Sequence, residues 1–544
     1  MGDKLKVLLV SVDAKHFHKP LAVWQLKAFV DDKNRGKDFL IDILESNINE
    51  PIDELVRDIC KVSPDILGFS CYIWNIETIK KVGNLVRQLL PSVKIILGGP
   101  EVSFEQNLAN YPFADTIIKG AGEEALLDIL TRVKKNEKLP TTIIGNSCNF
   151  PSYPTPITPD YLKSITADKI PADKKLFYYE ATRGCPFSCA FCLSSASTGV
   201  LEKPLQVVKD DIQKLLASGA TTIKFIDRTF NANKTRAIEL LEFIATLNTS
   251  ACFHFEMSPD LFCDKLFKTI AKLPKARVQF ELGIQSTNPD TLKAVGRKTD
   301  GSKAIKNITK LVDLNTMHIH LGLVAGLPFE TLDTFKQAVN AVYATKLHAI
   351  QLGFLKLLKG AKLNDIDYNA IFSPFAPYEV YKTATMSLDD FAELKRVDKI
   401  IDRFYNSGGF NATIEFAITK LFKNCAFDFF NLFAIYLQEK GIATNANLNI
   451  AYYALRQFLI ESNGDISQID HHIKLDCLSF DRGGLSLPKQ IERLQDKELE
   501  NHHRQVHHKN TFLTVEKFPQ DKKTRLFIYN TKDPITNRFN PTII

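Results

Sequence analysis

Six short apolar runs between residues 176 and 355 constrain the fold of this 544-residue chain more than any other feature. Each run is rich in β-branched and aromatic residues and is bounded by polar segments, which predicts strands. Stretches between them, such as 205–216 and 234–247, have helical periodicity. Strands that alternate with helices in this way form a parallel α/β sheet. The predicted strands are Leu176–Ala181, Thr222–Asp227, Cys252–Met257, Arg277–Ile284, His318–Ala325 and Ala349–Leu355.

The segment after the first predicted strand contains Cys185, Cys189 and Cys192 with CxxxCxxC spacing. Three thiolates from one loop can hold a cluster of four irons and leave one iron without a protein ligand. An iron with an open position can bind and reduce a small molecule, so this spacing indicates redox chemistry. Structural zinc sites usually pair two short CxxC-type segments, and the chain has no second pair. Three unrelated thiols that fall close together are the alternative.

The run from Glu180 to Cys192 closely resembles the signature of the radical S-adenosylmethionine (SAM) superfamily. This resemblance implies a partial barrel of six parallel strands, each followed by a helix. It also implies a [4Fe-4S] cluster whose open iron binds SAM and cleaves it reductively to a 5′-deoxyadenosyl radical. The chemistry of such a barrel lies where the carboxyl ends of the strands converge.

Two strand-end carboxylates are candidate SAM-binding residues under this resemblance. Asp227 stands where the superfamily often has a Gly-Gly-Glu segment that meets the SAM amino group, so the partner of that group stays open. Glu256 ends the third predicted strand, where relatives place a polar residue near the ribose or the methionine end. A carboxylate satisfied by a neighbouring lysine is the alternative for Glu256.

Two further segments match superfamily motifs. Gln285 and Arg297 resemble a "GxQS … R" segment near the cofactor, and the arginine can fork onto the SAM carboxylate. Gly326 and Pro328 belong to a run that matches the "GLPxET" turn, whose backbone usually lines the adenine pocket. The resemblance therefore implies that these four residues bind SAM.

The first 150 residues contain a second series of buried-strand runs with helical patterns between them. They predict a doubly wound, Rossmann-like α/β domain, which binds ligands at the carboxyl ends of its strands. Ser70 and the pair Gly98-Gly99 lie at such ends, where glycine lets a backbone approach a ligand closely. The predicted strands are Lys6–Val12, Asp65–Cys71, Lys94–Leu97 and Asp115–Lys119.

Four segments of this domain together resemble the cobalamin-binding domain that precedes many radical SAM enzymes: 13–18, 70–75, 98–103 and 119–124. The resemblance implies corrin contacts from Ser70, Trp74, Gly98, Gly99 and Glu101. The DxHxxG motif is absent, because the histidines after Asp13 stand at positions 16 and 18. We therefore expect cobalamin to bind without a protein histidine on cobalt. A domain that has lost its corrin and serves as a lid is the alternative.

Composition limits the cellular setting and the partners. No apolar stretch reaches about 18 residues, and neither a signal peptide nor a lipidation motif is present, so we expect a cytoplasmic protein without membrane partners. The ten cysteines show no regular framework, as in a reducing compartment. The net charge of +7 comes from short, scattered lysine runs without interleaved aromatic residues, which makes nucleic acid an unlikely partner.

The last third of the chain is mainly helical, with patterns over 387–405, 413–440 and 448–462 and short strands at 512–515 and 525–529. It resembles a family-specific domain of unknown function behind some radical enzymes of this type, which we expect to cover the barrel mouth and select the substrate. Phenylalanines such as Phe427 and Phe433 are expected in helix-packing cores. A proline-rich stretch at 151–159 marks the first domain boundary, so the predicted domains are 1–150, 160–372 and 373–544.

The resemblances together imply a cobalamin-dependent radical SAM enzyme that transfers a methyl group to an unactivated carbon. A flavodoxin or ferredoxin is the expected reductant, and the substrate is an unknown small molecule or peptide. One alternative is radical cyclisation or oxidation without methyl transfer. The other is an iron-sulfur binding or regulatory protein without catalysis.

Overall fold

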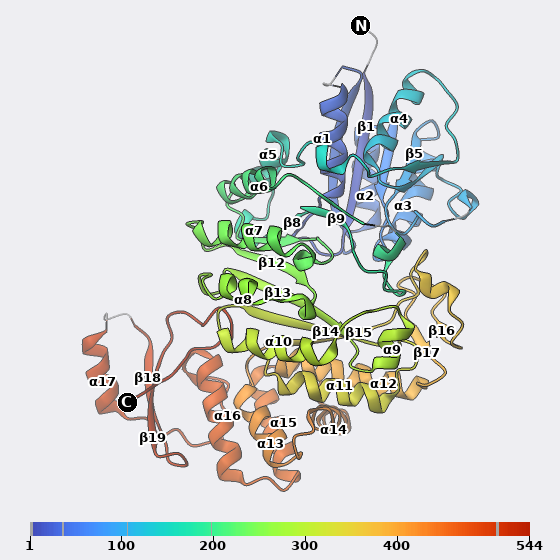
Figure 1. Cartoon of the computed structure of the whole chain (residues 1–544). Helices are drawn as coiled ribbons and strands as arrows, with labels where there is room; N and C mark the ends of the chain where they lie inside the picture. Colours follow the sequence, from blue (N-terminus) through green and yellow to red (C-terminus); the bar gives the residue numbers. More distant parts are fainter. Residues whose placement is uncertain (1–3, 35–36, 106, 197–198, 508–510) are drawn as a thin grey trace.

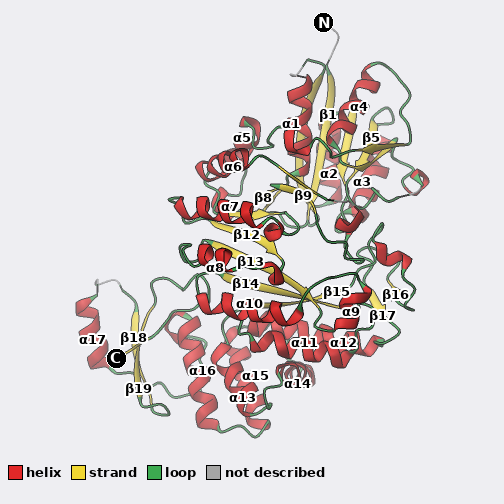
Figure 2. Cartoon of the chain, viewed as in Figure 1, coloured by secondary structure: helices red, strands yellow, loops and turns green. Residues whose placement is uncertain are grey.

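The computed structural model describes residues 4–34, 37–105, 107–196, 199–507 and 511–544. Two parallel sheets with covering helices lie one beyond the other, followed by a helical C-terminal region and a small antiparallel sheet (Figures 1 and 2). None of the helices in the described part of the chain combines the length and apolar character that a bilayer crossing requires.

The first sheet has the strand order β3-β1-β4-β5-β6-β7, and all its strands are parallel. Alternate residues of β1 face opposite cores: Val7 and Leu9 pack with helices α1 and α4, whereas Leu8 and Val10 pack with α2 and α3. This is a doubly wound arrangement whose strand order reverses at β1 and β4, where such sheets bind ligands. The elements are β1 (Leu5–Asp13), α1 (Ala22–Asn34), β3 (Phe39–Asn47), α2 (Ile52–Val62), β4 (Ile66–Ser70), α3 (Ile76–Leu89), β5 (Lys94–Gly98), β6 (Thr116–Gly120), α4 (Glu123–Lys134) and β7 (Thr142–Gly145).

The four strands predicted for this domain are confirmed, but β3 and β7 were not expected. Both are edge strands, and β3 is only partly buried because polar residues such as Asp42 and Glu45 interrupt its apolar pattern. An edge strand pairs on one side only, so its sequence is less apolar than that of a central strand.

The second sheet contains all six strands predicted between residues 176 and 355, in the order β15-β14-β13-β12-β11-β8-β2. Its strands are parallel. The strands are β8 (Leu176–Tyr179), β11 (Thr222–Phe225), β12 (Cys252–Met257), β13 (Val278–Gln285), β14 (His318–Ala325) and β15 (Ala349–Phe354). The helices are α5 (Pro159–Ala167), α6 (Leu205–Ala217), α7 (Lys234–Thr246), α8 (Asp264–Ile270), α9 (Pro289–Ala294), α10 (Gly301–Leu314) and α11 (Leu332–Ala344).

The seventh strand, β2 (His18–Lys19), comes from the N-terminal domain and pairs with β8 at the edge of the barrel sheet. His18 therefore lies in a short strand. Two residues are too few to show a periodic pattern, so this strand depends on the tertiary contact with β8.

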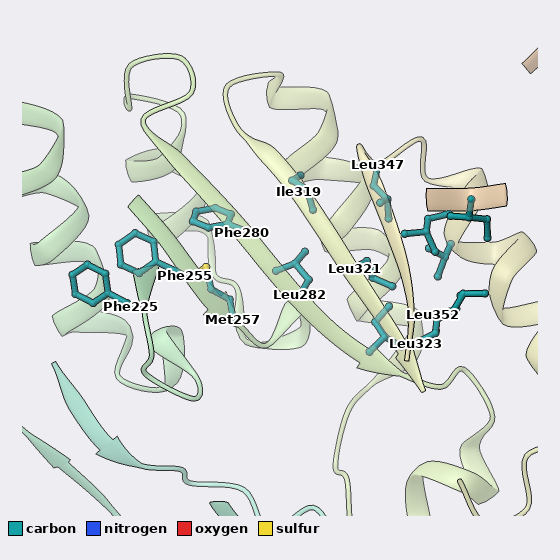
Figure 3. Packing of buried hydrophobic residues seen from close by; sticks show 14 of the residues in the cluster. Phe225, Phe255, Met257, Phe280, Leu282, Ile319, Leu321, Leu323, Leu347 and Leu352 are labelled. Atoms are coloured by element: carbon teal, nitrogen blue, oxygen red, sulfur yellow. The ribbon is translucent and has the colours of Figure 1, made fainter. Parts of the chain in front are cut away.

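Alternating burial along the strands from β8 to β14 separates an apolar face from a polar one. Figure 3 shows the apolar face, where Phe225, Phe255 and Phe280 follow one another on neighbouring strands and Leu282 and Leu321 continue the layer. The residues between them point to the other face and stay partly accessible. The polar face is therefore the inside of the partial barrel.

The C-terminal region is helical, as predicted, but residues 413–440 form two helices rather than one. Lys423 and Asn424 have positive φ angles of 49° and 64°, which end the first helix and turn the chain. Phe427 and Phe433 are buried in the helix core. The elements are α12 (Leu388–Ile400), a π-helical turn (Ile401–Tyr405), α13 (Asn411–Lys420), α14 (Ala426–Glu439), α15 (Leu448–Glu461), α16 (Ile466–Phe480), α17 (Lys497–Val506), β18 (Leu513–Phe518), β19 (Lys523–Ile528) and β20 (Thr542–Ile543).

The proline-rich stretch between the first two predicted domains is anchored to the protein. Phe150, Tyr153 and Ile157 are buried, and a short 3₁₀ turn covers Phe150–Ser152. A hairpin of β16 (Ile371–Phe372) and β17 (Val380–Lys382) follows the barrel. The domain boundaries at 150, 160 and 372 stay predictions.

Candidate functional site

The three motif cysteines lie in a loop that leaves the barrel sheet after β8. A small antiparallel hairpin of β9 (Thr182–Gly184) and β10 (Val200–Glu202) flanks this loop. Gly184 has φ +98°, and a Cβ there would lie 2.3 Å from the Gly199 carbonyl oxygen, so only glycine fits. The Ala190 amide donates to the Val295 carbonyl over 2.9 Å and thereby fixes the loop between Cys189 and Cys192.

All three thiols are free of disulfides and line one pocket. Burial raises the pKa of Cys189, and the nearby Arg297 opposes this shift. Its Nη1 lies 3.6 Å from the Cys189 sulfur. The Thr229 hydroxyl lies at the same distance, 3.6 Å, from the sulfur of Cys185. The loop thus presents three sulfur ligands beside a fixed cation.

These thiols fit a polynuclear cluster better than a single metal ion. Among the described residues, no group of three or more His, Cys, Asp or Glu side chains converges on one metal position. A structural zinc ion needs four such ligands in a tetrahedron. Three cysteines around one pocket can each bind one iron of a four-iron cluster and leave the fourth iron without a protein ligand. The donor set therefore agrees with the predicted [4Fe-4S] cluster.

The pocket has a volume of about 320 Å³ and opens at the carboxyl ends of the barrel strands. Its walls come from the cysteine loop and from strands β12 to β15. The lining residues are Cys185, Phe187, Cys189, Phe191, Cys192, Ser194, Arg228, Thr229, Glu256, Met257, Ser258, Glu281, Leu282, Gly283, Gln285, Arg297, Gly322, Leu323, Val324, Gln351 and Gly353. Three of the six predicted SAM-binding residues, Glu256, Gln285 and Arg297, line it.

Two carboxylates form the floor of the pocket. Glu256 and Glu281 are directly paired on neighbouring strands. The Lys224 ammonium lies 2.9 Å from Glu281 but 4.0 Å from Glu256. His254 Nε2 lies 3.2 Å from the Glu281 carboxylate. The negative charge of Glu281 is thus better compensated than that of Glu256. The neighbouring lysine considered for Glu256 in the sequence analysis pairs mainly with Glu281.

The two carboxyl groups are shifted in opposite directions. His254 and Lys224 together lower the pKa of Glu281 to about 2 against the effect of burial. Burial and the neighbouring Glu281 raise the pKa of Glu256. Glu256 therefore keeps unused capacity to accept a hydrogen bond or an opposite charge in the pocket.

Arg297 and Gln285 meet above this floor. Arg297 Nη2 donates to the Gly283 carbonyl, and its Nε is buried without a hydrogen-bond partner among the described residues. Gln285 has φ +74° next to a bulge in β13, and its amide folds back over Gly283. A side chain at position 283 would collide with this amide at 2.4 Å. Arg297 lines the pocket, so its guanidinium can donate to an anionic ligand there.

Asp227, Gly326 and Pro328 are buried and do not line the pocket. Asp227 is 1% exposed, and its Oδ2 accepts a 3.0 Å bond from the Ala181 amide. Burial raises the pKa of Asp227 to about 7. A Cβ on Gly326 would point at Val380, 2.9 Å away in the C-terminal region. The SAM-binding roles of these three residues stay predictions.

Sequence reasoning missed Glu330, which is fully buried in the same turn as Gly326. Its carboxylate accepts hydrogen bonds from Ser286, directly after Gln285, and from Thr334 in α11. Glu330 thus ties the end of β13 to the turn after β14. Its place in the "GLPxET" run was the available signal, but the partner on another strand could not be read from the sequence.

At the carboxyl edge of the first sheet, Ser70 and Trp74 lie beside the point where the strand order reverses. The Ser70 hydroxyl donates to the Val10 carbonyl over 3.4 Å, and the Trp74 indole donates to the Val12 carbonyl over 3.3 Å. Trp74 is 43% exposed and stacks on Tyr72, with ring centroids 4.3 Å apart. A flat, accessible aromatic pair at this edge suits a large planar ligand.

The two glycines at the carboxyl end of β5, Gly98 and Gly99, have different roles. Gly99 has φ +113°, and a Cβ there would lie 2.5 Å from the Cys71 carbonyl oxygen, so its close approach is to the protein's own backbone. A Cβ on Gly98 would meet only the Ile118 Cβ, at 3.8 Å. Gly98 is therefore the glycine that leaves room beside the turn.

Glu101 is engaged by the C-terminal half of the chain. It is 5% exposed, lies 3.2 Å from the Lys359 ammonium and accepts a hydrogen bond from the Tyr378 hydroxyl. These contacts tie the turn after β5 to the segment behind the barrel. The corrin-binding roles of Ser70, Trp74, Gly98, Gly99 and Glu101 stay predictions.

The two nearby histidines have separate surroundings. His16 is exposed, whereas His18 contacts the Tyr178 hydroxyl at 3.2 Å and has its pKa lowered by burial. The absence of a protein histidine on cobalt stays a prediction.

Three family models match the chain in succession. The B12 binding domain covers residues 7–130, the radical SAM superfamily 179–342, and the "Protein of unknown function (DUF4080)" 366–531. These ranges follow the two parallel sheets and the helical region in order.

Two curated relatives are methyltransferases. The 2-(S-pantetheinyl)-carbapenam-3-carboxylate methyltransferase of Streptantibioticus cattleyicolor is 23% identical over 73% of this chain and 62% of its own length. The cobalamin-dependent radical SAM methyltransferase TokK of Streptomyces tokunonensis is 25% identical over 58% of this chain and 50% of its own. The chain thus spans less than two thirds of either relative.

Among solved structures, the cobalamin-dependent SAM radical enzyme OxsB shares the fold, with a TM-score of 0.60 at 15% identity over 87% of this chain and 79% of OxsB. The chain therefore carries a B12 binding domain, a radical SAM domain and a DUF4080 domain in succession.

Proposed function

We propose that this protein is a cobalamin-dependent radical SAM enzyme that transfers a methyl group to an unactivated carbon of a small molecule or peptide. One observation carries the proposal: three cysteine thiols and the guanidinium of Arg297 line one pocket at the carboxyl end of the barrel. When bound, the cluster supplies one electron to cleave SAM, and the corrin supplies a methyl group.

The protein residues bind and orient the cofactors. Cys185, Cys189 and Cys192 hold the cluster, and the guanidinium of Arg297 takes the carboxylate of SAM. Glu256, the less compensated carboxylate of the floor, accepts from a hydroxyl or ammonium group of SAM or substrate. The apolar and aromatic walls of the pocket, Phe187, Phe191 and Met257, keep water from the reacting atoms.

In the N-terminal domain, Trp74 and Tyr72 offer the corrin an aromatic surface, and Gly98 leaves space for its nucleotide tail. We place the protein in the cytoplasm, where a flavodoxin or ferredoxin supplies the electron.

Anaerobic turnover tests this function. The reduced holoprotein should form 5′-deoxyadenosine from SAM, and S-adenosylhomocysteine should accumulate when hydroxocobalamin is supplied. Methyl transfer is tested by profiling metabolites and peptides of a deletion strain for products that lack one methyl mass.

The possible outcomes of these experiments lead to different conclusions. Formation of 5′-deoxyadenosine without any cobalamin uptake would exclude cobalamin-dependent methyl transfer and leave the N-terminal domain as a lid. A product formed by cyclisation or oxidation, without an added methyl group, would assign the protein to that reaction class and not to methyl transfer. No SAM cleavage by protein with full cluster content would overturn the enzyme assignment.

A further inference from the structure

Arg183 lies in β9, two residues before the first motif cysteine, and reaches across the boundary to the N-terminal domain. Its Nη2 donates to Glu123 over 2.9 Å and to Glu180 over 2.7 Å, and its Nε donates to Glu180 over 3.1 Å. The guanidinium also lies 4.2 Å from the centre of the Phe150 ring. One side chain thus contacts three separate segments.

The partners of Arg183 come from the parts of the chain whose relative placement matters for two cofactors. Glu123 is the first residue of α4, in the Lys119–Glu124 segment that resembles cobalamin-binding domains. Phe150 belongs to the anchored connection between the domains, and Glu180 follows β8. Arg183 therefore joins the cysteine hairpin to the N-terminal domain and to the barrel at once.

The ion pair between Arg183 and Glu123 is largely buried, and the charge of Arg183 is compensated by its two carboxylate partners. The side chains of Arg183 and Glu123 are 23% and 4% exposed. Burial opposes the charge of Arg183, but Glu180 and Glu123 outweigh this and raise its pKa above the ordinary value. Glu123 also lies in the first turn of α4, where the helix dipole favours a negative charge. Removing Arg183 leaves two carboxylates without their cation, and removing Glu123 takes away the partner of Arg183 in the N-terminal domain.

Several other contacts join these regions, among them the one from Lys203, next to β10, to Gln25 in α1 over 3.4 Å. Two of the others lie away from the cysteines. The pairing of β2 with β8 is at the sheet edge, and Glu101 with Lys359 and Tyr378 is at the turn after β5. Either contact can hold the domains together. Because Arg183 is two residues from Cys185, its contacts influence the position of the cysteine loop relative to α4.

We infer that Arg183 is a positioning residue that fixes the spacing between the cluster site and the corrin site, an inference that rests on the proposed function. A lysine cannot replace it, because a single ammonium cannot make parallel bonds to Glu180, reach Glu123 and stack on Phe150 together. The cluster itself depends on the cysteines and is independent of Arg183.

Hydrogen exchange on the corrin-free protein tests the contact directly. In Arg183→Lys and Glu123→Gln, peptides that cover β9, β10 and the start of α4 should exchange about tenfold faster, because a charge-assisted hydrogen bond between the two segments is lost. Arg132→Gln is the matched control, since it removes an exposed ion pair with Asp128 from the same helix. Exchange equal to that of the wild type in both test variants would overturn the inference.

Pulsed electron paramagnetic resonance on the holoprotein tests the spacing. With Co(II) corrin and reduced cluster present, the wild type and Arg132→Gln should give one narrow distribution of spin-to-spin distances. Glu123→Gln and Arg183→Lys should give a broader or shifted distribution at unchanged cluster content. An unchanged distribution would show that Arg183 only stabilises the fold.

The two experiments separate this inference from the proposed function. A wild-type protein that takes up no corrinoid would overturn the proposed function and the spacing role with it. The exchange experiment would then still decide whether Arg183 holds the hairpin against α4.

Discussion

The two parallel sheets of this chain place polar groups in different ways. The barrel sheet is polar on one whole face, where Lys224, His254 and Glu281 stand on three neighbouring strands and compensate one another. The central strands of the N-terminal sheet are apolar on both faces, and polar groups such as Ser70 lie at its carboxyl edge. The barrel thus builds the floor of its site from strand interiors and takes its cysteines from a loop, and the first domain builds its site from turns.

This difference predicts how each site responds to substitution. Strand residues in the barrel are held in register by neighbours on both sides, so a side chain can be exchanged while the backbone stays in place. Turn residues in the first domain set the path of the backbone itself. Changes in the barrel should therefore alter chemistry, and changes in the turns should alter folding.

The largest effect is expected from the cysteine loop. Cys185→Ala, Cys189→Ala and Cys192→Ala should each abolish the cluster, because the remaining two thiolates cannot retain it. Iron and sulfide content after anaerobic reconstitution measures this, and the exposed Cys148→Ala is the control. Full iron content in a variant with all three cysteines changed to alanine would refute the cluster site.

The turn after β5 is expected to show the next largest effect. Gly99→Ala should lower the free energy of unfolding by about 2 to 4 kcal/mol, since it combines a positive φ with a close backbone contact. Gly98→Ala should cost less than about 1 kcal/mol, because its surroundings are open. Denaturant unfolding compares the two variants, and equal losses would contradict their assigned roles. A larger residue at position 98 in a folded protein is then the clean test of corrin uptake.

Arg297→Ala should change binding with little change in folding. If the guanidinium takes the SAM carboxylate, affinity for SAM should fall by about 1.5 to 3 kcal/mol at full cluster content. Equilibrium binding to the reconstituted protein measures the loss. Lys298→Ala, at the next position in sequence, is the control, and an unchanged affinity for Arg297→Ala would make Arg297 a packing residue.

The smallest effect is expected from pH. Asp227 has its pKa raised to about 7, so the folded protein binds a proton more tightly than the unfolded chain, and stability should fall as the pH rises from about 4 to 7. Asp227→Asn should remove this slope and stabilise the protein at pH 8 by about 1 to 2 kcal/mol.

Glu281 is the contrasting case, because its pKa is lowered to about 2 and its contribution is present above pH 4.5 and lost as the pH falls toward 2. Unfolding measured from pH 3 to 8 separates the two residues. Equal slopes for the wild type and Asp227→Asn would contradict the shift at Asp227.

The sequence predicts central elements well because their patterns are local. The six barrel strands are apolar runs rich in β-branched and aromatic residues, and Cys185, Cys189 and Cys192 carry their own spacing. The two edge strands β3 and β7 lack a full apolar pattern, and β2 exists only through its pairing with β8.

The partners of charged residues could not be predicted in the same way. Glu101 resembles a ligand-binding residue in the sequence, but its partners Lys359 and Tyr378 lie more than 250 positions away along the chain. Gly99 fits a ligand-approach motif, although its nearest neighbour is the backbone of Cys71. Such contacts depend on tertiary structure that no local pattern encodes.

The pairing of β2 with β8 has a consequence for dissecting the protein into domains. Without the first 150 residues, β8 would present a row of unsatisfied amide and carbonyl groups to the solvent, because β11 occupies only its other side. Open strand edges of this kind recruit other chains and lead to aggregation. The isolated barrel should therefore be insoluble, and the N-terminal domain protects it through two residues that belong to neither site.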